Sequence, residues 1–396
     1  MFGTLRTAID ELGAVDLDAL SSAELNEAVE ELQRMRARLE AAEARVVARW
    51  DADRGWQLDG ARSGGAWLAC KCRLPPGVAH QRVRHARAVR SLPEVAAAWS
   101  AGEIDRTHIT ALLGARNPRT EEAFATGHKE LLDAARTQWF SSFRRVCDYW
   151  VQHADPDGAE DRAASQRSGR EVDLAQSFEG MWFGGMTFDE VSGTIVHTTL
   201  TIIEQELFEA DWAEAKARLG REPMIFDLQR TPAQRRADAM VEMATRARTA
   251  PVGGRRPAPL FTVVVGYETF AGRTCELWNR TVITLGTVAA WLGDAEIERV
   301  VFDSPSRVVD VGARRRFFRG ALRRAIEVRD RTCFHPTCDE APAQPQIDHI
   351  IESANGGDTT QVNGRLGCGF HNRRRNTHPD DWDTVPRRAG PPEPGD

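Results

Sequence analysis

The sequence predicts a mainly α-helical protein with a small β component, an α+β fold. Apolar residues recur with helical spacing from residue 21 to about residue 247, whereas the strand-like runs are short. Cysteine and histidine pairs enclose a segment near the C-terminus that is too small for a hydrophobic core of its own. We therefore expect a helical N-terminal domain followed by a small C-terminal module of mixed structure.

The composition predicts a globular protein that does not enter a membrane. The chain has 396 residues, of which 41% are hydrophobic and 28% are charged, and this length allows two or three domains with cores. No apolar run approaches the ~20 residues that a membrane helix needs, and the first residues lack the features of a secretion signal. We expect a cytoplasmic location and no membrane partner.

A long amphipathic helix is expected over residues 21–50. Ser21 and Glu24 form a capping box at its start. Apolar residues then follow at alternating steps of three and four, and they form one narrow seam. The seam residues are Leu25, Ala28, Leu32, Met35, Leu39, Ala42 and Val46. Such a seam packs either within one helical domain or against the same helix of a second chain, which would give a homodimer.

Helical patterns continue to about residue 250. Pro76 indicates one helix start, Gly102 separates two short helices, and Pro232 follows the cap residue Thr231. The polar stretch at 154–169 is expected to be a flexible loop.

A β-hairpin is expected at 172–188 around a Glu-Gly turn, before a helix from about Val196 to Ala217. Short strands are expected in "FTVVVGY", "RTVITLG" and "ERVVFD". The predicted domains are 1–250 (helical), 251–311 (linker and short strands), 312–378 (C-terminal module) and 379–396 (a disordered tail).

Four soft ligands near the C-terminus have the spacing of a closed metal site. Cys333 and Cys338 form one pair, and Cys368 and His371 form a second pair thirty residues on. Two such pairs match what a tetrahedral zinc site requires of a chain that folds back on itself. We expect a structural Zn²⁺ here, because the segment needs a cross-link to stay folded.

Between these pairs, the stretch "QIDHIIESANGG" places Asp348 next to His349 ahead of a Gly-Gly turn. A short strand would direct these two side chains to opposite faces. The return strand would place Asn363 just before a helix that carries Asn372. In the alternative, non-catalytic interpretation this segment is a structural zinc knuckle, in which Asp348 caps a turn and His349 is a surface residue.

These residues resemble the HNH endonucleases, whose fold is a zinc-stapled ββα-metal module. The resemblance covers about residues 333–378. It implies that His349 is the general base, that Asn363 holds the hairpin and helps to orient His349, and that Asp348 binds a catalytic divalent ion. Asn372 stands where the family has its last metal-binding His, so an amide oxygen would bind the ion. Such a ligand suits Mg²⁺ or Mn²⁺.

Arginine is concentrated around this module. Between residues 312 and 375 there are 12 Arg against seven acidic residues, although the whole chain has a net charge of -6. A positive strip beside a site for phosphate favours DNA as the partner, while the alternative is an ordinary solvated helix face. The expected DNA contacts are Arg316, Arg319, Arg323, Arg324, Arg373, Arg374 and Arg375.

The upstream segments "GARSGGAWLA" and "RTPAQRRADAMVEMA" resemble actinobacterial proteins in which a helical domain of unknown function precedes an HNH module. The resemblance implies a metal-dependent endonuclease that cleaves DNA to 5′-phosphate and 3′-hydroxyl ends. Two alternatives stay open: a non-catalytic, zinc-stabilised DNA-binding protein derived from such a nuclease, and a dimeric scaffold built on the helix at 21–50.

Overall fold

The computed structural model describes residues 2–249, 263–264, 274–277, 280–289, 302–304, 307–308, 318, 320–342, 345–351 and 357–377. Several expected features lie outside these residues: the linker at 250–260, Arg316, Arg319, the turn at Asn355 and Gly356, and the tail at 379–396.

Helices make up most of the described chain, and the strands are short and antiparallel, which confirms the mainly α class with a small β component. None of the described helices combines the length and apolar character needed to span a membrane. The chain forms two compact units, Met1–Cys147 and Asp148–Asp396. The helical region expected over 1–250 is therefore divided near its middle.

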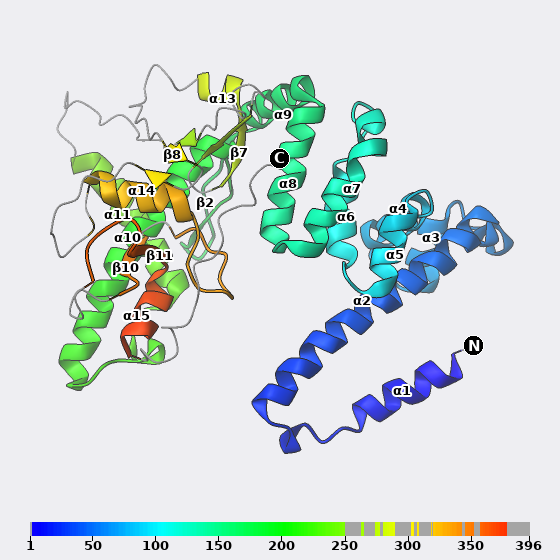
Figure 1. Cartoon of the computed structure of the whole chain (residues 1–396), viewed down its shortest axis with the longest axis horizontal. Helices are drawn as coiled ribbons and strands as arrows, with labels where there is room; N and C mark the ends of the chain where they lie inside the picture. The colour runs from blue at the N-terminus through cyan, green and yellow to red at the C-terminus, as the bar shows by residue number, and fades with distance from the viewer. Residues whose placement is uncertain are drawn as a thin grey trace. The chain divides into compact units, whose positions relative to one another are not determined.

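The first unit is all helical (Figure 1). One part of its core lies where α2, α3 and α4 meet, and Val47, Leu68 and Val83 are buried there. Its elements are α1 (Gly3–Gly13), η1 (Leu17–Ala19), α2 (Ser22–Ala52), η2 (Gly55–Asp59), α3 (Gly64–Lys71), α4 (Pro76–Val89), α5 (Pro93–Ala101), α6 (Arg106–Gly114), α7 (Glu121–Thr137) and the start of α8 (Phe140–Ala154).

Three helix boundaries in this unit confirm the sequence predictions. The capping box at the start of α2 is formed, because the Glu24 amide donates to Ser21 Oγ at 3.3 Å and Glu24 Oε2 accepts from the Ser21 amide at 2.8 Å. Pro76 begins α4. Gly102 ends α5 with φ of +79°, a conformation that residues with a Cβ rarely adopt.

The apolar seam of α2 does not pack inside the unit. Figure 1 shows the first half of α2 (dark blue) extending beyond α3, α4 and α5. The face of α2 that packs on α4 and α5 is a different one, and it contains Ala37, Ala41 and Ala48. Small side chains on this face allow the helices to approach closely, so the larger seam residues remain on the surface.

The second unit begins with helices that differ from expectation at two places. The flexible loop expected at 154–169 is wrong, because α9 (Pro156–Ser168) forms there. Asp155 caps it by accepting from the Gly158 amide at 3.0 Å, and this cap and the proline outweigh the polar composition. The next helix, α10 (Glu190–Leu219), begins earlier than Val196 because Asp189 caps it.

α11 (Pro232–Thr249) packs along α10 after the short η3 (Ile225–Asp227). The expected hairpin is confirmed, since β1 (Glu171–Val172) pairs with β4 (Met186–Thr187), and β2 (Ala175–Gln176) pairs with β3 (Trp182–Phe183). The short strands expected further on are present in part. They are β5 (Val263–Val264), β6 (Thr274–Leu277) and β7 (Val282–Thr284) in one sheet, α13 (Leu285–Ala289), and the pair β8 (Phe302–Ser304) and β9 (Arg307–Val308).

The C-terminal module consists of α14 (Gly320–Asp330), a hairpin of β10 (Gln346–His349) and β11 (Gly364–Gly367), and α15 (Gly369–Thr377). The register places Asp348 opposite Arg365 and His349 opposite Gly364. A Cβ on Gly364 would overlap Ile326 Cδ1 of α14. The missing side chain therefore lets α14 pack directly on the hairpin.

Candidate metal centre and polar network

The four predicted metal ligands converge. One ligand atom from each of Cys333, Cys338, Cys368 and His371, here called the Cys/His cluster, lies within 4.8 Å of the others. His371 Nδ1 is 3.4 Å from Cys333 Sγ and 3.2 Å from Cys368 Sγ. Three thiols and one imidazole are a donor set that closed metal sites use, so these residues could hold a metal ion.

The fold delivers the cluster from three places. Cys333 and Cys338 lie in the loop after α14, Cys368 links β11 to α15, and His371 is in the first turn of α15. The Phe334 amide donates to the Leu366 carbonyl at 2.7 Å, which ties that loop to β11. A metal ion here would therefore join the loop, the hairpin and the helix.

The three thiols of the cluster differ in their pKa values. The hydrogen bond from the Cys333 thiol, followed by contacts with His371, lowers the pKa of Cys368 to about 4. The same hydrogen bond, together with burial, raises the pKa of Cys333 above its ordinary value. Burial also raises the pKa of the Cys338 thiol. Cys368 is thus the thiol that most easily supplies a thiolate.

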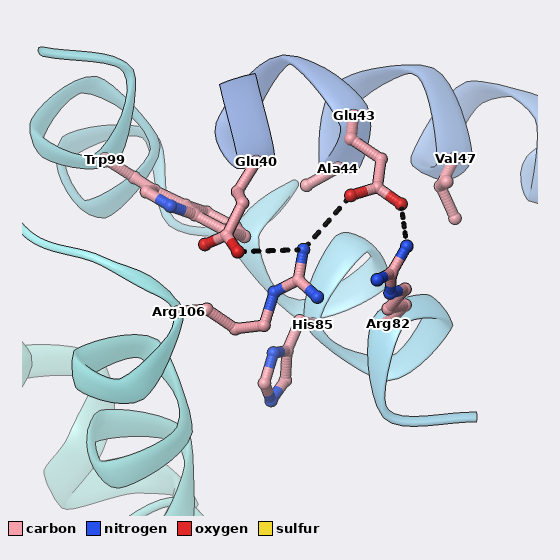
Figure 2. A pocket seen from close by; sticks show the side chains of 8 residues that line it. All are labelled: Glu40, Glu43, Ala44, Val47, Arg82, His85, Trp99 and Arg106. Atoms are coloured by element: carbon pink, nitrogen blue, oxygen red, sulfur yellow. Dashed lines mark hydrogen bonds and ion pairs between the residues drawn. The ribbon is translucent and has the colours of Figure 1, made fainter. Parts of the chain in front are cut away.

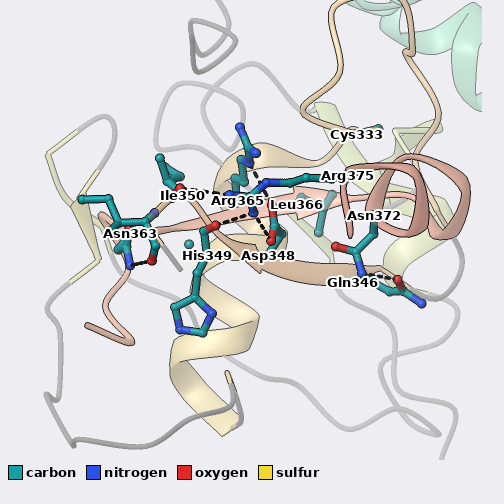
Figure 3. A network of polar contacts seen from close by, with 12 residues as sticks. Cys333, Gln346, Asp348, His349, Ile350, Asn363, Arg365, Leu366, Asn372 and Arg375 are labelled. Carbon is teal, nitrogen blue, oxygen red and sulfur yellow. Dashed lines mark hydrogen bonds and ion pairs between the residues drawn. The ribbon is translucent and has the colours of Figure 1, made fainter. Parts of the chain in front are cut away.

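Asp348 lies under two buried guanidinium groups (Figure 3). Arg365 Nε donates to Asp348 Oδ2 at 3.1 Å, and Arg375 pairs with Oδ1. The side chains of Asp348, Arg365 and Arg375 are 12%, 5% and 4% exposed. Arg375 also donates to the backbone carbonyls of His349 and Ile350. The expected metal ligand therefore has arginine partners in this structure.

Asn372 lies on the same face of β10 as Asp348. Its Nδ2 donates to Gln346 Oε1 at 2.6 Å, and Gln346 is two residues before Asp348 on the strand. That contact does not use the amide oxygen of Asn372. The structure thus brings one carboxylate and one amide to one face, beneath α15.

His349 points to the opposite face of β10. Its Nε2 lies 2.9 Å from Thr359 Oγ1, and its ring packs on Phe318 with 4.4 Å between the centroids. Burial lowers the pKa of His349 below 6.5, opposed by Asp348 and assisted by Arg375. This shift favours the neutral form of the imidazole. It is not directed toward the Asp348 and Asn372 face.

Asn363 holds the loop of the hairpin. Its Oδ1 accepts from the Ile351 amide at 2.8 Å, and its Nδ2 donates to the carbonyls of Ile351 at 2.9 Å and Asp358 at 2.8 Å. Thr359, which sequence reasoning missed, is the residue whose hydroxyl lies within hydrogen-bond distance of His349 Nε2. No spacing pattern singles out this threonine, because its position depends on the path of the loop.

The expected DNA-binding arginines occupy different environments. The structure describes the side chains of Arg323, Arg324, Arg374 and Arg375, whereas that of Arg373 lies outside the described part. Arg323 and Arg324 are partly exposed and bond Glu327. Arg374 is exposed. Arg375 is 3% exposed and pairs with Asp348, and its expected contact with phosphate stays a prediction.

A second polar cluster, in the first unit, was not expected from the sequence. Figure 2 shows Glu43 of α2 between Arg82 and Arg106, with buried His85 and Trp99 lining the same small pocket. Burial, with Arg84 and Arg106 nearby, lowers the pKa of His85 to about 4. The scattered histidines show no spacing signal, so only the fold could identify this one.

Comparison with known proteins identifies a family but no individual curated or solved relative. No curated protein and no solved structure matches the chain. A family model described as a domain of unknown function, DUF222, matches residues 26–330. This range begins within α2, ends with α14 and stops just before Cys333. Since the match covers most of the 396 residues, the chain belongs to the DUF222 family.

Proposed function

We propose that this protein is a metal-dependent DNA endonuclease of the HNH type, with its site in the C-terminal module. The observation that carries the proposal is the convergence of the Cys/His cluster at a hairpin and helix that bear Asp348, His349 and Asn363. The resemblance of the sequence to HNH endonucleases, in residue types and in spacing, supports the proposal.

We propose zinc for the Cys/His cluster. Zn²⁺ accepts three thiolates and one imidazole in a closed tetrahedral site, and no ligand position is then left for a substrate. The ion would stabilise the fold, because the loop, hairpin and helix that it joins have few large buried side chains of their own.

In the proposed reaction each residue of the module has a separate task. Neutral His349 takes a proton from the water that attacks phosphorus, and Asn363 keeps the hairpin loop that presents His349. Asp348 and Asn372 would hold Mg²⁺ or Mn²⁺, which would stabilise the charge that develops on the phosphate oxygens. The water oxygen would form a new bond to phosphorus as the P–O3′ bond breaks, and O3′ would take a proton from solvent, which gives a 5′-phosphate and a 3′-hydroxyl end.

The proposed mechanism also constrains where the substrate would bind, because its residues lie on two faces of β10. His349 and Asp348 lie on opposite sides of this strand, and among the described residues β10 pairs with β11 alone. We propose that the phosphodiester crosses the other edge of β10, which would bring it near both side chains. The exposed Arg374 of α15 would bind a neighbouring phosphate.

A second candidate function is non-catalytic DNA binding. The pairing of Asp348 with Arg365 and Arg375 favours it, because a carboxylate that already has two cationic partners gains less from a divalent ion. In this case the zinc-stapled module would bind nucleic acid without cutting it.

A plasmid-nicking assay with Mg²⁺ and with Mn²⁺ separates the two candidates. Replacing His349 with alanine (His349→Ala) should abolish nicking, while zinc content and DNA retardation stay at wild-type levels. The matched control is His153→Ala, which alters an exposed histidine far from His349 in the sequence and should nick normally. Equal nicking by His349→Ala and wild type would contradict the mechanism. Wild-type protein that retards DNA but never nicks it would favour the second candidate.

A further inference from the structure

The exposed seam of α2 is a surface without a partner in its own unit. The exposed fractions are 44% for Leu32, 39% for Met35, 48% for Leu39 and 61% for Val46. In heptad terms these are the a and d positions, whereas the b, c and f positions pack on α4 and α5. The seam from Leu32 to Val46 is therefore open to a second helix, while Leu25 and Ala28 are half-buried.

The first half of α2 needs a packing partner to be stable as a helix. Residues 22–36, all of which the structure describes, include no buried side chain, and α1 has none either. A helical stretch of this length is marginal in water when it has no tertiary packing. The apolar residues Leu5, Ile9 and Leu12 of α1 are also exposed, so α1 does not cover the seam.

We propose that α2 pairs with α2 of a second copy of this chain in an antiparallel coiled coil. The steps of the seam place Leu25 opposite the partner's Ala42, Ala28 opposite the partner's Leu39, and Leu32 opposite the partner's Met35. Large side chains thus face small ones in two of these layers, which fills the space between the helices evenly. A parallel pair would instead place alanine on alanine at positions 28 and 42.

The charges beside the seam support the same orientation. Glu31 and Arg38 occupy g positions, and an antiparallel pair places Glu31 beside the partner's Arg38 and the reverse. A parallel pair would need the Arg38 side chain to reach Glu43 of the partner. Glu43 already forms ion pairs with Arg82 and Arg106 of its own unit, so it is a poor partner for Arg38 of a second chain.

The first test measures the mass of the full chain by sedimentation across the micromolar range. We expect twice the chain mass of 44.0 kDa. The double variant Leu32→Glu/Leu39→Glu should sediment as a 44.0 kDa monomer with unchanged helical circular dichroism from its body. The control Ala23→Glu/Asn26→Glu adds the same charge away from the seam and should remain dimeric. A monomeric wild type, or a dimer that survives the seam variant, would overturn the proposal.

The second test fixes the orientation and does not alter the apolar seam. Glu31→Arg should weaken the dimer by about ten-fold, because two attractive pairs become repulsive. The double exchange Glu31→Arg/Arg38→Glu should restore wild-type affinity in an antiparallel pair. In a parallel pair the same exchange places the arginine introduced at position 31 beside the partner's Arg36 and makes the dimer weaker still, which would refute the antiparallel arrangement. This test is independent of any nuclease activity.

Discussion

At the scale of single residues, Arg375 connects the chemistry of the module to its stability. Its guanidinium pairs with Asp348 and donates to the carbonyls of His349 and Ile350, so one buried side chain fixes the end of β10. The sequence places this arginine in a basic run, and nothing in that run distinguishes it from its neighbours. The structure shows that the i+3 step from Asn372 turns it toward the strand.

We expect Arg375→Ala to lower the free energy of unfolding of the module by about 3 kcal/mol, since Asp348 loses a buried partner and two carbonyls lose their donor. Urea denaturation followed by hydrogen exchange of the hairpin amides measures the effect. The neighbouring Arg374 is exposed on the same helix, so Arg374→Ala should change stability by less than about 0.5 kcal/mol. Similar losses in the two variants would show that the buried pairing does not stabilise the module.

Some site residues could be predicted from the sequence because their chemistry sets their spacing. Ligands of one ion must come from short turns, so Cys333, Cys338, Cys368 and His371 were identifiable before any fold was known. Thr359 and Arg365 were not, since their partners depend on the register of the hairpin and on the course of its loop.

At the scale of elements, the Cys/His cluster is the main cross-link of the C-terminal module. Cys368→Ser removes the ligand at the junction of β11 and α15. We expect the bound metal to fall from one equivalent per chain to well below one, and hydrogen exchange in β10, β11 and α15 to become fast. Elemental analysis and exchange mass spectrometry measure these two changes.

The matched control is Cys70→Ser, which alters an exposed thiol of the first unit. This variant should keep its metal and its exchange pattern. Full metal content in Cys368→Ser would instead indicate that the four residues do not form one site.

Elements were predicted best where a cap or a hydrophobic period is strong. Ser21 with Glu24 marked the start of α2 correctly, and the same kind of signal, Asp155 with Pro156, marks α9. The polar composition of 154–169 suggested a loop, yet local capping determined the outcome. The seam of α2 predicted the helix, but which face it buries depended on the small residues that α4 and α5 contact.

At the scale of the whole molecule, the buried His85 of the first unit and the partly buried Glu190 of the second unit respond to pH in opposite directions. Folded His85 binds its proton with a pKa of about 4, below the ordinary 6.5, so the first unit loses stability as the pH falls through this interval. Burial, with Asp148 and Asp189 nearby and Arg162 opposing them, raises the pKa of Glu190 to about 7. The second unit therefore gains stability as the pH falls from 7 toward 4.5.

We expect acidification from pH 7 to pH 5 to destabilise the first unit by about 2 kcal/mol and to stabilise the second by a similar amount. Hydrogen exchange at the two pH values, resolved by unit, measures both. His85→Leu should remove the loss in the first unit, and Glu190→Gln should remove the gain in the second. An unchanged pH response in His85→Leu would show that another group controls the first unit.

The position at which the family match ends affects the design of recombinant fragments of this protein. The family match stops at residue 330, where α14 ends. This helix packs against Gly364 of the hairpin, and its Arg329 donates to the carbonyls of Gln361 and Gly364. Arg331 reaches back to Glu276 of β6 at 2.8 Å. The conventional boundary of the family therefore cuts through a shared core, and a recombinant fragment that begins after α14 would expose the hairpin surface that this helix covers.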